Sequence, residues 1–412
     1  MSKNVVVVGS GIIGTACAHY LVESGHRVTI LEKGQFGRAC SYANCGYVCP
    51  SHVLPLAMPG AIQRTMKMAL QRDSAFRIKF RLNWQFWKWM FRFARRCNQR
   101  DMMESAKAIN PLLQWSRTLY TELMNDLGQA SDWQTRGLLF VFASQKAMEH
   151  YAETNELLTR EFGVSATPYA GEQLTVLEPS LKPGSAGGWH YAGDAHMRPD
   201  RLLSAWQSSL QARGVKIVEN TPLEQWQTHG SKVHLINTPQ GEITADAVVI
   251  ATGAWTPQLA KLLRTQIPIQ PGKGYSVTMA RPSICPAIPM IFEEHHVAVT
   301  PFASGYRIGS MMEFVGYDES IAPKRIQFLK NSAAHYLREP VAVPETEQWY
   351  GWRPMTPTSR PMICRLPKLE NVYLAAGHNM LGLSMAPATG KLISQLVSEV
   401  ATDIPTAPYQ VA

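Results

Sequence analysis

The sequence predicts an α/β protein of two domains, and three observations lead to this fold class. A β-branched strand at residues 4–9 runs into a glycine turn and then into a helix. Strands that end in glycine turns return much later, at residues 245–255 and 371–382, so one buried parallel sheet would collect distant segments. The remaining segments contain strands of alternating polarity, which predict a second, antiparallel α+β domain. These strands are residues 137–143, 273–280, 295–303 and 306–311.

The composition is that of a folded protein with one unusual segment. The chain has 412 residues, of which 45% are hydrophobic, which excludes disordered and fibrous proteins. Its net charge is +9, but the excess is local, because the other 32 basic residues are balanced by 31 acidic ones. The eight basic residues of segment 75–100, which has no acidic residue, are Arg77, Lys79, Arg81, Lys88, Arg92, Arg95, Arg96 and Arg100.

The cysteine content and the N-terminal residues predict the cellular compartment of the protein. Seven cysteines, an odd number without paired spacing, favour a reducing compartment. Cys40, Cys45 and Cys49 match no common spacing of metal ligands, and His295 and His296 are interpreted as structural, so we expect no metal. With no signal peptide before the first strand and no window of about 18 apolar residues, we expect a cytoplasmic protein.

The first glycine turn has the features of a dinucleotide site. It reads Gly9, Ser10, Gly11, Ile12, Ile13, Gly14. Gly9 allows the tight turn, Gly11 lets backbone N–H groups approach a pyrophosphate, and Gly14 allows close packing of the helix on the strand. Glu32 ends the second strand, residues 27–31, and can accept hydrogen bonds from a ribose diol, which favours FAD or NAD over NADP. The alternative is a tight turn without a ligand.

The rest of the chain favours FAD over NAD. An NAD domain usually continues at once with further βα units, whereas residues 35–135 contain no second unit of this kind. The next elements of nucleotide-binding type are the strands with glycine turns at residues 245–255 and 371–382. Three separated pieces that converge on one ligand indicate a long cofactor and a discontinuous domain.

These pieces resemble, in order and spacing, the D-amino acid oxidase superfamily of FAD-dependent amine oxidoreductases. Within it, the chain is more similar to bacterial D-amino acid dehydrogenases and their D-hydroxyproline and glycine oxidase relatives. The motifs that carry the resemblance are residues 9–14 with Glu32, residues 41–46 (SYANCG), residues 272–276 (GKGYS), residues 351–357 (GWRPMTP) and residues 377–390. Met380, where glycine oxidase relatives carry Arg, argues against glycine oxidase proper, and His52 stands where dehydrogenases have an aromatic residue.

The resemblance implies a Rossmann-like FAD-binding domain of the glutathione-reductase type. It would consist of residues 1–75, 190–265 and 350–412, and the substrate domain of residues 76–189 and 266–349. No Cys stands near Arg353, where some relatives attach FAD, so a non-covalent, dissociable FAD is expected. The residues expected to bind it are Gly9, Ser10, Gly11, Ile12, Ile13, Gly14, Glu32, Lys33, Ser41, Asn44, Gly46, Leu223, Thr252, Gly253, Trp255, Gly377, His378, Gly382 and Leu383.

The implied reaction is oxidation of an amino acid at Cα by hydride transfer to flavin N5. It needs a cation to clamp the carboxylate, preferably a planar guanidinium, and Arg353 matches the family's carboxylate arginine. Tyr275 is a second candidate for the same carboxylate, and the further candidates for the pocket are His52, Tyr47 and His378. Substrates would be D-amino acids or imino acids of the D-proline and D-hydroxyproline type. The alternatives are an oxygen-using amine oxidase and a non-catalytic, flavin-bound subunit of a complex.

Segment 76–96 is predicted to form one basic, aromatic helix. At helical spacing, Phe76, Phe80, Trp84, Trp87 and Phe91 form one stripe, Arg77, Arg81, Lys88, Arg92 and Arg95 the adjacent one, and Phe86, Trp89 and Phe93 widen the apolar arc. Such a helix suits an anionic membrane interface, which would fit electron transfer to a quinone. A helix packed between the domains is an equal alternative. Nothing else in the chain resembles a nucleic-acid-binding module, so no nucleic acid is expected as a partner.

Overall fold

The computed structural model describes residues 1–69, 74–79 and 82–411. Its first sheet contains the three predicted pieces side by side in the strand order β19-β20-β13-β1-β2-β9. All neighbours are parallel except β19 and β20, which are antiparallel. The strands are β1 (Asn4–Val8), β2 (Arg27–Leu31), β9 (Lys216–Val218), β13 (Ala247–Ile250), β19 (Met362–Arg365) and β20 (Val372–Ala376). The prediction that distant segments share one sheet is confirmed.

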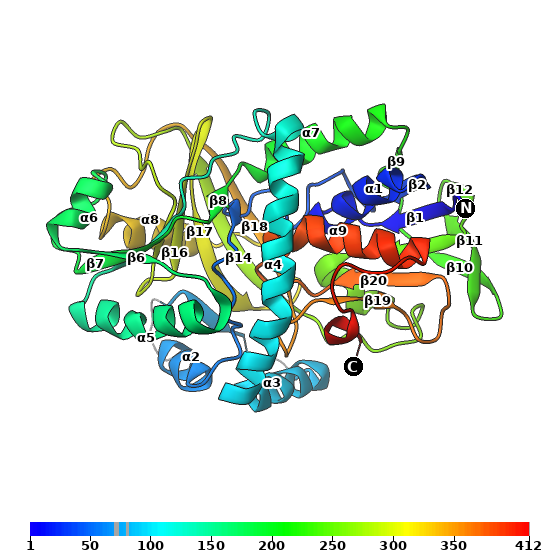
Figure 1. The fold of residues 1–412 in the computed structure, drawn as a ribbon, viewed down its shortest axis with the longest axis horizontal. Coiled ribbons are helices and arrows are strands. Elements are labelled where there is room, and N and C mark those ends of the chain that lie inside the picture. The colour runs from blue at the N-terminus through cyan, green and yellow to red at the C-terminus, as the bar shows by residue number, and fades with distance from the viewer. Residues whose placement is uncertain (70–73, 80–81, 412) are drawn as a thin grey trace.

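Different layers cover the two faces of this sheet. Helices α1 (Ile12–Glu23) and α9 (Gly382–Ser398) lie side by side on one face, and the long helix α4 (Gln99–Leu127) crosses α9 (Figure 1). The small antiparallel sheet of β10 (Gln225–His229), β11 (Lys232–Thr238) and β12 (Gly241–Thr244) covers the other face. Strand β1 is therefore buried on both sides, as its unbroken valine run predicts.

The second sheet has the order β18-β14-β17-β16-β15-β5-β7-β6, with β4 paired to β17. Its strands are β4 (Phe76–Ile78), β5 (Leu138–Phe142), β6 (Thr167–Ala170), β7 (Gly187–Tyr191), β14 (Gln270–Met279), β15 (Met290–Phe292), β16 (Val297–Phe302), β17 (Gly305–Phe314) and β18 (Glu345–Met355). The four predicted strands are present as β5, β14, β16 and β17. The sheet is antiparallel except for two parallel pairs, β15 with β5 and β17 with β4. The domain boundaries remain a prediction, and β7 and β18 run across two of them.

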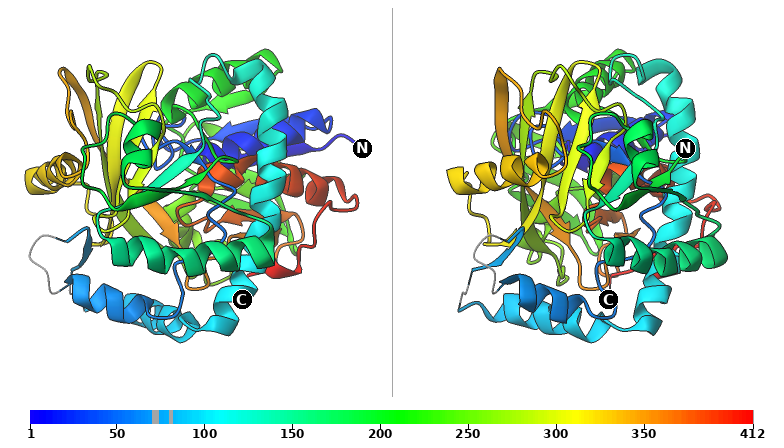
Figure 2. Two further views of the ribbon diagram at one scale, coloured as in Figure 1. Left: turned by 60° about the vertical axis from the view of Figure 1, so that its left-hand side comes forward. Right: turned by 90° about the vertical axis from the view of Figure 1, so that its left-hand side faces the viewer.

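The remaining elements surround the sheets. They are α2 (Ala61–Ala69), α3 (Trp84–Arg96), α5 (Gln145–Phe162), α6 (Glu172–Leu177), α7 (Pro199–Ala212), α8 (Pro323–Ala334), the 3₁₀ turns Gly253–Leu259 and Ala407–Tyr409, and the short pair β3 (Tyr47–Val48) and β8 (Ala195–His196). Helices α2 and α3 lie next to each other at one end of the molecule in all views (Figures 1 and 2). Among the described residues, no helix has the length and apolar composition needed to cross a bilayer.

The prediction of one helix over residues 76–96 is wrong. Residues Phe76–Ile78 form β4, which pairs with the end of β17, and the helix begins only at Trp84. Asn83 ends the extended backbone, because its side-chain oxygen accepts a hydrogen bond from the Phe86 N–H at 3.0 Å and caps the helix. Phe80 and Arg81, which the predicted stripes include, lie outside the described residues.

Helix α3 also packs on a different face from the one that its stripe suggests. Phe86 and Trp89 are buried against Phe314 and Met355, the ends of two strands of the second sheet. Trp84 and Phe91, from the predicted apolar stripe, are 80% and 63% exposed. The widened apolar arc is thus divided between a buried face and an exposed face.

Candidate functional site

A cavity of about 810 Å³ lies between the two sheets. At one end it is lined by the glycine turn after β1 and by Glu32, and at the other end by residues of α2 and α3. Of the residues predicted to bind the cofactor, Ser10, Gly14 and Gly377 are not on its wall. Those on the wall are Gly9, Gly11, Ile12, Ile13, Glu32, Lys33, Ser41, Asn44, Gly46, Leu223, Thr252, Gly253, Trp255, His378, Gly382 and Leu383.

The turn after β1 has the geometry that a pyrophosphate requires. Gly9 has a φ of +103°, and a Cβ on Gly14 would lie 1.8 Å from the Gly9 carbonyl oxygen, so the turn can close only with glycines. Ser10 donates from its N–H and its hydroxyl, both at 2.8 Å, to Glu32, which fixes this carboxylate at the cavity wall. The N-cap residue of α1 is Gly11, which has no side chain to cap the helix. These features fit the ADP half of a dinucleotide.

The loop of residues 41–46 forms the next part of the wall. The Ser41 hydroxyl accepts a hydrogen bond from the Ile12 N–H at 3.0 Å, which ties the loop to the start of α1. Within the loop, the Asn44 side chain bonds the Ser41 carbonyl and the Gly46 N–H, at 2.9 and 2.7 Å. The buried Arg307 donates to the Asn44 carbonyl at 2.8 Å. The loop is therefore held rigidly between the sheets.

The turn after β20 forms another part of the wall that belongs to the first sheet. Its backbone leads into α9, whose N-terminus carries no side-chain cap and lies on the cavity wall at Gly382 and Leu383. The imidazole of His378 is buried and shares a hydrogen bond of 2.9 Å with Thr389. Burial lowers the pKa of His378 to about 3, so this histidine is neutral and braces the turn.

Arg353 lies on the cavity wall beyond the loop. It stands on β18, and its Nη1 donates to the Met311 carbonyl at 2.7 Å. Burial lowers the pKa of the guanidinium, while the thiols of Cys40 and Cys45 act in the opposite direction. In the part of the chain that the structure describes, no carboxylate lies within ion-pairing distance of it. A partly buried cation without an anionic partner is costly and suits an anionic ligand.

The two predicted tyrosines line the cavity, but both hydroxyls are hydrogen-bonded to other groups of the protein. Tyr275 donates to Glu313 at 2.7 Å, and Glu313 in turn lies 2.7 Å from Arg325. The Tyr47 hydroxyl lies 2.8 Å from the Met290 carbonyl and 2.9 Å from the Val299 carbonyl. Both phenols brace the second sheet in this structure, and their contact with a substrate remains a prediction.

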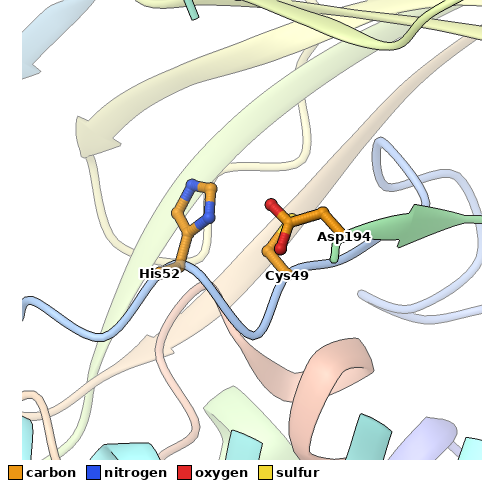
Figure 3. Close-up of side chains that lie close together, drawn as sticks. All are labelled: Cys49, His52 and Asp194. Carbon is orange, nitrogen blue, oxygen red and sulfur yellow. The ribbon is translucent and has the colours of Figure 1, made fainter. Parts of the chain in front are cut away.

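His52 belongs to a group that the sequence did not indicate. His52 and Cys49 come from one turn, in which the His52 N–H donates to the Cys49 carbonyl at 3.2 Å, and Asp194 precedes β8 (Figure 3). One ligand atom from each lies within 4.8 Å of the others, so the group could hold a metal ion. However, Asp194 already accepts bonds from the Ser51 N–H and hydroxyl at 3.1 and 2.5 Å. These bonds favour a hydrogen-bonded brace, and of the three residues only His52 and Cys49 line the cavity.

Burial sets the charges of this group. It lowers the pKa of His52 to about 4 and raises the pKa of Asp194 to about 7. His52 is consequently a neutral imidazole at the cavity wall. No local pattern joins Asp194 to His52, so only the fold brings the two together.

The cavity continues beyond Arg353, and sequence reasoning missed this part. Its wall is formed there by apolar side chains of the loop before α2 and of α3, with one acidic residue, Glu293, and His296 after β15. The apolar side chains are Leu56, Met58, Trp89, Met90 and Phe93. The sequence left open whether the aromatic residues of α3 face a membrane or pack between the domains, and in the structure Trp89 and Phe93 line the cavity.

Comparisons with known proteins agree with this geometry. The family model described as FAD dependent oxidoreductase matches residues 4–396. The D-amino acid dehydrogenase of Paramagnetospirillum magneticum is 32% identical over 408 residues, 96% of this chain and 94% of that protein. The D-amino acid dehydrogenase of Granulibacter bethesdensis is 29% identical over 418 residues, 99% of both chains. The crystal structure of glycine oxidase from Geobacillus kaustophilus superposes with a TM-score of 0.80 at 21% identity, over 100% of this chain and 98% of that one.

Proposed function

The chain belongs to the FAD dependent oxidoreductase family, and from this premise we propose that it oxidises free D-amino acids at the Cα–N bond. FAD is its cofactor. When bound, FAD supplies the acceptor for two electrons. The work left to the protein is to bind the amino acid, orient its Cα–H and keep the amine neutral.

Arg353 is the observation that carries this proposal. Its guanidinium lies on the wall of the cavity that begins at the nucleotide turn, and no carboxylate of the described residues pairs with it. The α-carboxylate of an amino acid would supply the missing anion and could bond two N–H groups at once. A free amino acid therefore fits better than an amine without a carboxylate.

The other residues around the cavity have supporting tasks. Glu32 and the N-terminus of α1 would hold the ADP end of the cofactor, and the loop of residues 41–46 would lie along it. His52, neutral at physiological pH, can accept a hydrogen bond from the substrate's ammonium group and favour its deprotonation. His378 keeps the turn before α9 in place.

Flavin reduction without oxygen tests the proposal. D-amino acids, but not their L-enantiomers, should bleach the flavin of the FAD-loaded protein. Arg353→Ala should raise the KM for a D-amino acid by about a hundredfold or more while FAD stays bound, and Arg353→Lys should fall between. Arg201→Ala, which removes an arginine paired with Asp132 away from the cavity, is the matched control. If no amino acid bleaches the flavin, the chain is a flavin-bound subunit without this activity.

The apolar end of the cavity favours a quinone as the electron acceptor over oxygen. Dioxygen needs no large binding site, whereas a quinone ring needs an apolar slot that reaches the flavin. The side chains of Trp89, Met90 and Phe93 line such a slot next to α3. Reduction of a soluble quinone analogue should be faster than oxygen consumption, and the reverse order would identify an oxidase.

The surface beside this slot suits a membrane that contains the quinone. Helices α2 and α3 and the residues around them expose large apolar side chains next to exposed basic ones. The apolar ones are Ile62, Met66, Leu82, Trp84, Trp87 and Phe91, and the basic ones are Arg77, Lys79, Lys88, Arg92 and Arg95. We therefore place the protein peripherally on the inner face of the cell membrane, with α3 against anionic lipid.

Vesicle flotation tests the membrane contact. The FAD-loaded protein should float with vesicles of anionic lipid and remain behind with neutral vesicles. Replacing Trp84 and Phe91 by serine should abolish flotation without changing flavin reduction by amino acids, because neither side chain lines the cavity. A protein that stays in the soluble fraction with anionic vesicles would contradict this placement.

A further inference from the structure

The turn between β15 and β16 places a carboxylate on the cavity wall. Along β15, Met290 and Phe292 are fully buried in the core of the second sheet, so Ile291 and Glu293 face the other way, into the cavity. The Glu293 N–H donates to the Val141 carbonyl at 3.1 Å, which fixes the backbone at this point. The side chain of Glu293 is therefore held at one place on the wall.

No resident group of the described part of the chain satisfies this carboxylate. No described donor lies within hydrogen-bonding or ion-pairing distance of its oxygens, and Arg64, the cation that faces it from α2, is too far away to pair. Burial and the neighbouring Glu294 raise the pKa of Glu293, and Arg64 lowers it. A partly buried carboxylate on the cavity wall without a resident donor leaves room for a donor on a ligand.

The register of the sheet relates Glu293 to the proposed carboxylate clamp. Phe292 pairs with Val297, and Val297 with Ser310. Glu293 follows Phe292 in the turn to β16, and Met311 follows Ser310 on β17, so both lie one residue beyond this ladder. The Arg353 guanidinium is bound to the carbonyl of that Met311. Two strand spacings, roughly 10 Å, thus separate the β17 backbone, which binds the Arg353 guanidinium, from the β15 backbone, which leads to Glu293.

The wall between these two charges is mostly apolar. It includes Ile291 and Ala298 of the same hairpin and the ring of Phe140, which lies 5.6 Å from the ring of His52. A ligand that spans this distance needs a carboxylate at one end, an aliphatic stem in the middle and a hydrogen-bond donor at the other end. This outline is that of a polar amino acid.

We propose that Glu293 forms a subsite that binds a hydroxyl or ammonium group on the side chain of the substrate. The inference rests on the proposed function, since it takes Arg353 as the site of the α-carboxylate. It makes D-amino acids with hydroxyl or amino side chains the preferred substrate class. Acidic side chains are excluded, because they would place a second carboxylate against Glu293.

Pairs of substrates that differ only in the donor test the subsite. The rate and the apparent Kd of flavin reduction are measured without oxygen for D-lysine against D-norleucine, D-threonine against D-valine, and cis-4-hydroxy-D-proline against D-proline. At least one pair should show a preference of about tenfold or more for the donor, carried mainly by Kd. If the D-amino acids bleach the flavin but no pair shows a preference, the subsite is disproved. If none bleaches it, the proposed function itself fails.

Variants of Glu293 then identify the group that binds the donor. Glu293→Leu should remove the preference for the member of each pair that carries the donor. Glu293→Gln keeps an acceptor but no charge, so it should retain a preference for hydroxyl and lose one for ammonium. Glu294→Gln is the matched control, because Glu294 is adjacent but does not line the cavity. A preference that survives Glu293→Leu would overturn the assignment.

Discussion

Gly274 is the residue that gives Arg353 its position. A Cβ at this place would lie 2.2 Å from Nη1 and 2.6 Å from Cζ of Arg353, so the guanidinium occupies the space that any other residue would fill. The glycine of the GKGYS motif makes room for an arginine 79 residues later in the sequence, because β14 and β18 pair with Gly274 opposite Gly351 and Gly272 opposite Arg353. Two of the motifs that carry the family resemblance, residues 272–276 and 351–357, therefore act together.

Gly274→Ala should therefore impair substrate binding more than folding. The flexible end of Arg353 can move aside at low cost in stability, but it then loses its place on the wall. We expect the KM for a D-amino acid to rise about tenfold or more, with an unchanged FAD content and a nearly unchanged Tm. Gly193→Ala, where nothing lies within 4 Å of a new Cβ, should behave as the unmodified protein. An unchanged KM would show that Arg353 does not bind the substrate from this position.

Asp194 should make stability depend on pH near neutrality. Burial raises its pKa to about 7, well above its ordinary value of 3.8, although bonds from Ser51 and Cys49 and the charge of Arg117 oppose this rise. The folded state thus binds a proton more tightly than the unfolded state. Its contribution to stability is complete below about pH 4 and is lost as the pH rises through 7.

The variant Asp194→Asn isolates this contribution. Between pH 5 and 8, the Tm of the unmodified protein should decrease relative to that of the variant, by a few °C in order of magnitude. The measurement is a series of thermal unfolding curves for both proteins in the same buffers. Parallel pH profiles for the two proteins would mean that Asp194 stays ionised throughout.

At the scale of an element, α3 combines two tasks on opposite faces. Phe86 and Trp89 attach it to the ends of β17 and β18, and the Trp89 indole N–H donates to the Pro268 carbonyl at 3.1 Å. Trp84 and Phe91 remain exposed on the other face. Because Trp89 also lines the cavity, this attachment fixes one wall of the apolar slot.

Truncation of one side chain on each face of α3 should change the stability by different amounts. Phe86→Ala should lower the free energy of unfolding by about 3 kcal/mol or more, because it empties a fully buried site. Phe91→Ala should change it by no more than about 0.5 kcal/mol in the absence of lipid. Chemical denaturation of both FAD-loaded variants provides the comparison, and equal losses would contradict the assignment of faces.

The contrast between elements shows what the sequence can predict. The valine run of β1 with its glycine turn, and the later strands β13 and β20, follow from local patterns, because buried parallel strands have a distinctive composition. Helical periodicity over residues 76–96 led to the wrong prediction of one continuous helix. The spacing of residues cannot show that Asn83 starts a new element or that β4 pairs with β17. Glu293 and Asp194 could not be predicted, since their places depend on sheet register and long-range contacts.

At the scale of the whole molecule, the FAD site is built from segments that are far apart in the sequence. The cavity is lined by residues near Gly9 and Glu32, by Thr252 after β13, and by Leu383 at the start of α9. Each segment belongs to a different piece of the first sheet. The second sheet supplies the facing wall through Arg353. The free energy of binding FAD is therefore available to hold both sheets in this arrangement.

Removal of FAD should lower the stability of the entire protein. At a free FAD concentration a thousand times Kd, binding to the folded state alone stabilises it by about 4 kcal/mol. The Tm should thus rise with FAD concentration. Gly14→Val, which places side-chain atoms against the Gly9 carbonyl, should remove this dependence.

Because no Cys lies beside Arg353 in the sequence, flavin should separate from the chain on acid precipitation and leave the pellet colourless. Flavin that stays with the precipitated chain would show a covalent bond, and a Tm indifferent to FAD would show that the two sheets are held together without it.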